Sequence, residues 1–150
     1  MAHPVSARFV PIREVLCEVL GAAPPLEEVR VIVKDREQFA RLPASQHPAL
    51  GVFYADGVGT ERARWSGNRR DHSYEFEVHV AVRSLESAQA CEDLLFAYVE
   101  AVEDALRVAP TLGGLVRFMT VSLVRRAGAK VDANWHAQAV LLVTCEQRVP

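Results

Sequence analysis

The most regular pattern in the chain is the alternation of apolar and polar residues from Tyr74 to Val82. Apolar side chains occupy every second position, and glutamate, histidine or alanine occupies the positions between them. Successive side chains of a β-strand point to opposite faces of a sheet. The pattern therefore predicts a strand of an antiparallel sheet with one buried face and one face in water.

Two segments carry the three- and four-residue apolar spacing of amphipathic helices. The first covers residues 5–20, with Ser6 as a candidate N-cap and Pro11 as a residue that suits the first turn. The second follows Ser84, also a candidate N-cap, and runs to Val108. At 1.5 Å per residue this second helix is about 30 Å long, which is enough to cross a small sheet.

The other apolar runs predict further strands, at residues 29–33, 49–54, 115–126 and 135–146. We expect a turn around Gly128 between the last two strands and one helical turn at residues 36–41. This order of elements favours an α+β fold in a single domain covering residues 1–150. The expected fold is a mainly antiparallel sheet of about four to five strands, with one long and one shorter helix packed on one face.

Residues 56–73 are predicted to form a long loop or a hairpin arm, because the segment is irregular and too long for a tight turn. Strand extensions near residues 61–65 and 71–74 would be joined by a turn at Ser66-Gly67-Asn68. The segment holds four arginines around one tryptophan: Arg62, Arg64, Trp65, Arg69 and Arg70. Arginine and tryptophan are favoured interface anchors, so we interpret these five as subunit-interface candidates. Nucleic-acid binding and an ordinary mobile loop remain alternatives.

The composition is that of a soluble globular protein, with a net charge of −2 and half of the residues apolar. This charge gives no reason to expect nucleic acid or an anionic membrane as a partner. No apolar run approaches the ~20 residues that span a bilayer, and no signal peptide is recognised. The three cysteines are far apart, and their spacing suggests neither disulfides nor a zinc site. They are expected to be small buried residues: Cys17, Cys91 and Cys145.

The chain contains none of the common nucleotide-binding, metalloprotease or serine-hydrolase motifs. Gly57-Val58-Gly59 is interpreted as a flexible turn rather than a phosphate loop. His79 and His136 fall on polar strand faces and would meet a carboxylate such as Glu77 only across the sheet, so we interpret them as solvated or interface histidines. Acidic pairs such as Glu92-Asp93 fit the solvated face of the long helix. We therefore expect no catalytic residues, no metal and no cofactor, and the protein is not expected to be an enzyme.

A turn joins the end of the long helix to the next strand, and its residues are Pro110, Thr111, Leu112, Gly113 and Gly114. Proline prevents the helix from continuing, and glycines allow a backbone path that side chains obstruct. We expect Leu112 to fix the turn to the core. The segment from Asp104-Ala105-Leu106 through this turn to Leu115-Val116 resembles a pattern in the tail terminator, or tail completion, proteins of long-tailed bacteriophages.

The order of elements is also similar to that family, whereas residues 35–48 match nothing in it. The resemblance implies a structural virion protein that forms a ring, usually hexameric, at the head-proximal end of the tail tube. Such a ring ends tube polymerisation and offers a docking surface for the neck of the head. Its partners would be copies of itself, the major tail tube protein and a head-completion or connector protein, with DNA only as passing cargo and no membrane. Gene transfer agents and tailocins would look similar. The alternative is a stand-alone α+β domain that binds a small ligand or regulates an enzyme.

Overall fold

The computed structural model describes residues 9–55, 61–66, 69–131 and 133–149, and of residues 61–66, 69–71, 131 and 148–149 it describes the backbone only. The helices are α1 (Phe9–Ala22), α2 (Arg36–Ala40) and α3 (Ala88–Arg107), with short 3-10 turns η2 (Pro24–Leu26) and η3 (Ala44–Gln46). The strands are β1 (Val31–Val33), β2 (Ala49–Tyr54), β3 (Glu61–Ser66), β4 (Arg69–Ser84), β5 (Phe118–Val131) and β6 (Asn134–Val149).

The strands form one sheet in the order β1-β2-β4-β6-β5, and β3 pairs with β4 outside this path. All pairs are antiparallel except β1 with β2. The α+β class and the mainly antiparallel sheet are therefore confirmed, with six strands in place of the expected four to five. The extra strand is β3, which the sequence left undecided between a loop and a hairpin.

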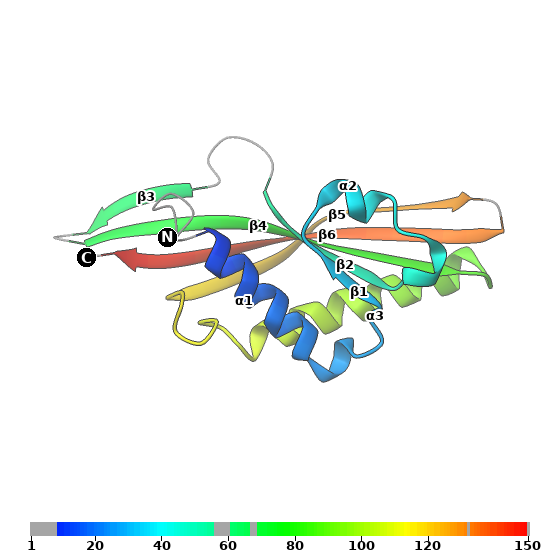
Figure 1. Ribbon diagram of the computed structural model, residues 1–150, viewed down its shortest axis with the longest axis horizontal. Coiled ribbons are helices and arrows are strands. Elements are labelled where there is room, and N and C mark those ends of the chain that lie inside the picture. The colour runs from blue at the N-terminus through cyan, green and yellow to red at the C-terminus, as the bar shows by residue number, and fades with distance from the viewer. Residues whose placement is uncertain (1–8, 56–60, 67–68, 132, 150) are drawn as a thin grey trace.

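The main core lies between the sheet and the helices α1 and α3, which cover the same face (Figure 1). The strict alternation on β4 explains this, because every second residue from Tyr74 to Val82 is at most 1% exposed and belongs to this core. The apolar stripe of α3 and the buried positions of β6 complete the same cluster. Helix α1 adds Ile12, Leu16 and Leu20, which are fully buried. The predicted helix-on-sheet packing is confirmed for these two helices.

Helix α2 packs on the opposite face of the sheet, which the sequence predicted to be in water (Figure 1). Its Phe39 forms a second apolar cluster with Val33, Ala49 and Phe53. The prediction of one wet face is therefore wrong for the part of the sheet near β2. Asp35 caps this five-residue helix by accepting from the backbone N–H groups of the next turn, which explains why so short a helix forms here.

Several predicted boundaries need correction. Ser87, not Ser84, is the N-cap of α3, because the Ser87 side chain accepts from the N–H of Ala90 at 3.0 Å. Gly128 lies within β5, paired with Ala137, and the expected turn comes after Val131 instead. The candidate cap Ser6 and the residues Gly57-Val58-Gly59 lie outside the described residues.

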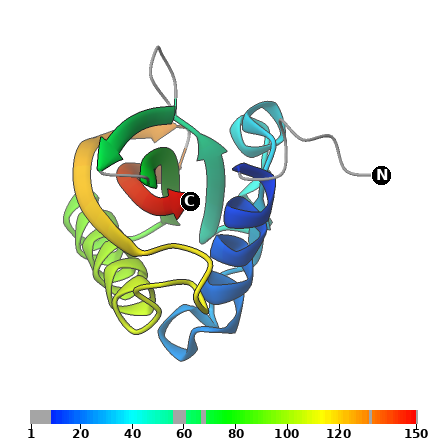
Figure 2. The same cartoon turned by 90° about the vertical axis from the view of Figure 1, so that its left-hand side faces the viewer.

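The molecule is elongated because β4, β5 and β6 are long strands that run side by side. With 16 residues at ~3.3 Å each, β4 extends about 50 Å, well beyond the reach of the 20-residue α3. One end of the sheet, formed by β3 with parts of β4 and β6, projects past the helices (Figure 1). Viewed along that end, the sheet is strongly curved, and α1 and α3, which cover the same face, lie at different places around the curve (Figure 2).

Candidate functional site

The projecting end of the sheet is a three-stranded arm, defined here as β3 with residues 69–73 of β4 and 146–149 of β6. Strand β3 continues the line of β2 along β4: Tyr54 is paired with Phe76, and Glu61 is paired with Tyr74. On its other side, β4 remains paired with β6 as far as Arg70 and Val149. The expected strand extensions of the hairpin are confirmed.

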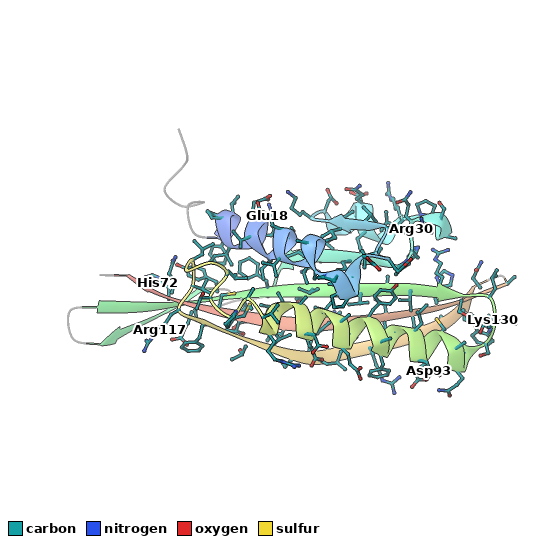
Figure 3. The ribbon with its side chains drawn as sticks, turned by 90° about the horizontal axis from the view of Figure 1, so that it is seen from below. Glu18, Arg30, His72, Asp93, Arg117 and Lys130 are labelled. Carbon is teal, nitrogen blue, oxygen red and sulfur yellow. The ribbon has the colours of Figure 1, made fainter. Side chains whose placement is uncertain are left out.

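The base of the arm is anchored in the core by aromatic rings. His72 is 3% exposed and stacks on Tyr74, with ring centroids 5.9 Å apart. Phe9 of α1 packs edge-on against Tyr74 at 4.8 Å. In Figure 3, His72 and Arg117 lie near the end where the arm begins, far from Asp93 and Lys130 at the opposite end. His72 is thus buried, whereas none of the histidines was predicted to be.

The five interface candidates fall on the two strands of this hairpin. The pairing places Arg62 opposite Ser73, Arg64 opposite Asp71 and Trp65 opposite Arg70. Their side chains lie outside the described part of the structure. Strand β3 pairs with β4 alone, so its outer backbone edge has no strand beside it among the described residues. An edge of this kind is a template for pairing with another chain.

The turn after α3 has the backbone geometry that its sequence suggests. Gly113 and Gly114 have φ angles of +72° and +92°, in the left-handed region that favours glycine. Leu112 has a φ of +49° and is only 3% exposed, so a buried side chain holds the turn against the core. The N–H groups of Gly114 and Val116 both donate to the carbonyl of Thr111 at 3.0 Å. These contacts lead the chain directly into β5.

A groove of about 420 Å³ lies on the α2 face of the sheet, and the sequence did not suggest it. Small side chains on two of its three strands lower its floor: Ala81 of β4 and Ala127 of β5 are both paired with Gln138 of β6. The next row is Arg83, His136 and Ala129. The wall comes from α2 and the segment after it, including Phe39, Leu42 and His47.

At one end of the groove, His79 joins a polar network beneath α2. Its Nε2 lies 2.8 Å from Glu77 Oε1, and its Nδ1 lies 3.3 Å from the amide nitrogen of Gln138. The amide donates to Nδ1, so Nε2 carries the proton and donates to the carboxylate, which fits the neutral ring. Arg36 contacts the same Glu77 oxygen at 3.4 Å and donates to the Tyr54 carbonyl at 2.6 Å.

Burial lowers the pKa of His79 below its ordinary value, and this outweighs the contacts with Glu77, which raise it. The ring is 7% exposed and packs edge-on against Phe53 at 4.9 Å. The interpretation of His79 as a solvated histidine is therefore wrong, although its meeting with Glu77 was one of the arrangements considered. The missed signal was Phe39, whose apolar side chain within the polar segment 35–48 marks a second covered surface.

The remaining candidates give no further site among the described residues. No three His, Cys, Asp or Glu residues lie close enough there to hold a metal ion. Cys91 and Cys145 are buried as expected, whereas Cys17 is half-buried, and burial raises the pKa of the Cys145 thiol to about 12. Within the described ranges, no helix has the length and apolar character needed to cross a membrane.

Comparisons with known proteins show a similarity to a solved structure. Neither a protein-family model nor a curated protein sequence matches the chain. A chain of a solved structure described as "Virion of native gene transfer agent (GTA) particle" aligns over 97% of this chain and 99% of its own length. The two are 14% identical, with a TM-score of 0.44. A similarity this low carries no inference about function.

Proposed function

We propose that this protein is a structural virion protein that closes into a ring, of six copies in the simplest case, on the head-proximal end of a phage tail tube. The ring ends tube polymerisation and presents a docking surface to the head-completion or connector protein. It lies at the tail–neck junction and DNA passes through its lumen. The role needs no covalent step and no cofactor.

The observation that carries the proposal is the arm. Its three strands continue the sheet beyond the helices, and the outer edge of β3 has no strand beside it among the described residues. At the other side of the sheet, the 14-residue strand β5 has β6 as its only partner strand within the described part of the chain. A subunit with one open edge at each side can make a head-to-tail contact, and such contacts give a closed ring when the rotation closes.

The resemblance of Asp104–Val116 to tail terminators supports the choice among ring-forming proteins. In the structure this segment is a turn held against the core by Leu112, and it borders the base of the arm, where the Leu115 carbonyl accepts from the Gln147 side chain at 3.0 Å. We therefore assign it a folding role, and assign subunit contact to the arm.

The first test removes the candidate contact. Arg64→Ala combined with Trp65→Ala is expected to reduce the particle mass, measured by light scattering, from that of a ring to that of smaller species. Arg41→Ala removes another exposed arginine, the C-cap residue that follows α2, and serves as the matched control that leaves the mass unchanged. A double variant that still forms the full ring would exclude these two residues as the contact.

A second function remains, and the groove beside α2 is the observation that favours it: a stand-alone domain that binds a small ligand. Negative-stain images of the protein mixed with tail tubes separate the two. The ring proposal predicts caps on the order of 100 Å wide at one tube end, a size expected for several domains closed into a ring. Small monomers that ignore the tubes would favour the alternative.

A further inference from the structure

The groove on the α2 face has an excess of positive charge. Arg36 and Arg83 line it together with His47 and His136, and the charge of Arg125 in the neighbouring row also acts on His79, so the positive charge comes from the arginines. The carboxylate near these groups is Glu77, which is already bound by His79 at 2.8 Å and by Arg36 at 3.4 Å. Among the described residues, no carboxylate forms an ion pair with Arg83 or Arg125. The groove is therefore suited to an anion that the chain itself does not supply.

Arg83 has unused hydrogen-bonding capacity at the floor of this groove. Its Nε is buried and has no hydrogen-bond partner among the described residues. Its Nη2 donates to the Leu42 carbonyl at a long 3.4 Å. Buried donors in proteins almost always have partners, and a guanidinium matches a carboxylate with two parallel hydrogen bonds. Because Nε is closed to solvent, a ligand in the groove would reach this guanidinium through its terminal nitrogens.

The groove opens at the free edge of the sheet. Ala127, Gly128 and Ala129 of β5 form its outer border, and no strand other than β6 pairs with β5 in the ranges that the structure describes. A chain that paired with this edge would place every second side chain on the groove face, beside small alanine side chains. The β-bulge between Leu123 and Arg125 divides β5 into two regularly paired parts, and the part that follows the bulge is the one next to the groove.

We propose that this groove binds the carboxylate of an acidic side chain carried by an extended segment of another protein chain, which pairs with the free edge of β5. Arg83 is the main anchor for the carboxylate, and Arg125 steers it. The proposal goes beyond the ring assignment and concerns the occupant of a groove on each single subunit. Both proposals use the edge of β5, so a ring contact at this edge and the bound segment would exclude each other there.

The test uses two seven-residue peptides with blocked ends, one alternating valine with glutamate and one alternating valine with glutamine. Calorimetry with the whole protein is expected to show saturable binding of the glutamate peptide and at least tenfold weaker binding of the glutamine peptide. The ring proton NMR signals of His47 and His136 are expected to shift only with the first. Equal affinities, or no saturable binding, would overturn the proposal while leaving the tail-tube test unaffected.

Matched variants locate the site. Arg125→Gln and Arg126→Gln remove adjacent charges on opposite faces of β5, since Arg126 contacts Glu92 of α3 at 3.3 Å. We expect Arg125→Gln to weaken binding several-fold, Arg83→Gln to abolish it, and Arg126→Gln to leave it unchanged. Ala129→Leu fills the exposed border of the groove without changing charge, and it is expected to block binding even if Arg83→Gln does not fold. Equal losses for Arg125→Gln and Arg126→Gln, or free glutarate binding as tightly as the peptide, would contradict the site or its extended occupant.

Discussion

Successive side chains of each strand point alternately to the face under α1 and α3 and to the face under α2. The two faces differ in burial and in chemistry. On β4, the first face carries Tyr74, Phe76 and Val78, all fully buried. The second carries Glu77, His79 and Arg83, which form hydrogen bonds at the side of an open groove. The first face is closed by two helices and the second only in part, by one helix of five residues.

This difference assigns stability mainly to the first face and binding mainly to the second. A continuous apolar face supplies most of the stability of a domain of this size. The α2 face adds a small apolar cluster around Phe39 and leaves charged groups near solvent. We therefore expect substitutions on the first face to change stability and substitutions on the second to change binding with little effect on stability.

The largest expected effect is that of Phe76→Ala. Phe76 is fully buried and its ring packs 6.1 Å from that of Phe9. Removing a buried phenylalanine side chain costs about 3–5 kcal/mol, because it loses apolar burial and leaves a cavity. Urea unfolding measures the change. The neighbouring Glu75→Ala, on the other face, is expected to cost less than about 1 kcal/mol. Similar losses for the two variants would remove the distinction between the faces.

A smaller effect is expected in the turn that connects α3 to the sheet. Gly113→Ala is predicted to cost about 1–2 kcal/mol, because φ at +72° disfavours any side chain. A Cβ there would meet no atom within 4 Å, so backbone strain is the whole cause. Valine is expected to cost more than alanine, because its branched Cβ is stiffer.

Gly128→Ala, within β5, is the matched control for Gly113→Ala. It has no positive φ, and its Cβ would lie in ordinary contact with the His136 carbonyl at 3.4 Å. The stability is expected to change by less than about 0.5 kcal/mol. An equal cost at both glycines would contradict the assignment of strain to the turn.

The smallest effect is the pH dependence of the α2 face. Burial lowers the pKa values of His79 and His47 in the folded protein. As the pH falls below about 6.5, the unfolded chain therefore binds protons before the folded protein does, and the free energy of unfolding decreases. The loss between pH 7.5 and pH 5.5 is expected to be smaller in His79→Gln than in the wild type. Unchanged wild-type stability over this range would contradict the burial of these rings.

The sequence predicted the apolar face well because its signal is local and periodic. The alternation around Phe76 and the apolar stripe of α3 each fix which residues face the core, whatever they pack against. Strand β2 was predicted with its observed bounds, residues 49–54. The turn at Gly113 was also predictable, because proline restricts the backbone and glycine permits positive φ at the residue itself.

The α2 face was not predictable in the same way because it forms between segments far apart in the chain. Phe39 reaches Phe53 and His79, and Arg83 reaches Leu42, 41 residues away. No periodic pattern in the sequence predicts such contacts. The groove depends in addition on Ala81, Ala127 and Ala129 lying in neighbouring rows, which only the register of three strands decides. The arm was predictable in part: its strands were expected, whereas the pairing of β3 with the edge of β4 next to β2 was not.

The most direct test of the central claim is to image tail tubes grown in the presence of this protein and to measure their length. The ring assignment predicts short tubes, each with a ring of this protein on one end, while the variant Arg64→Ala combined with Trp65→Ala lets the tubes grow on. Tubes that lengthen equally with and without the wild-type protein, and that carry no cap, would contradict it.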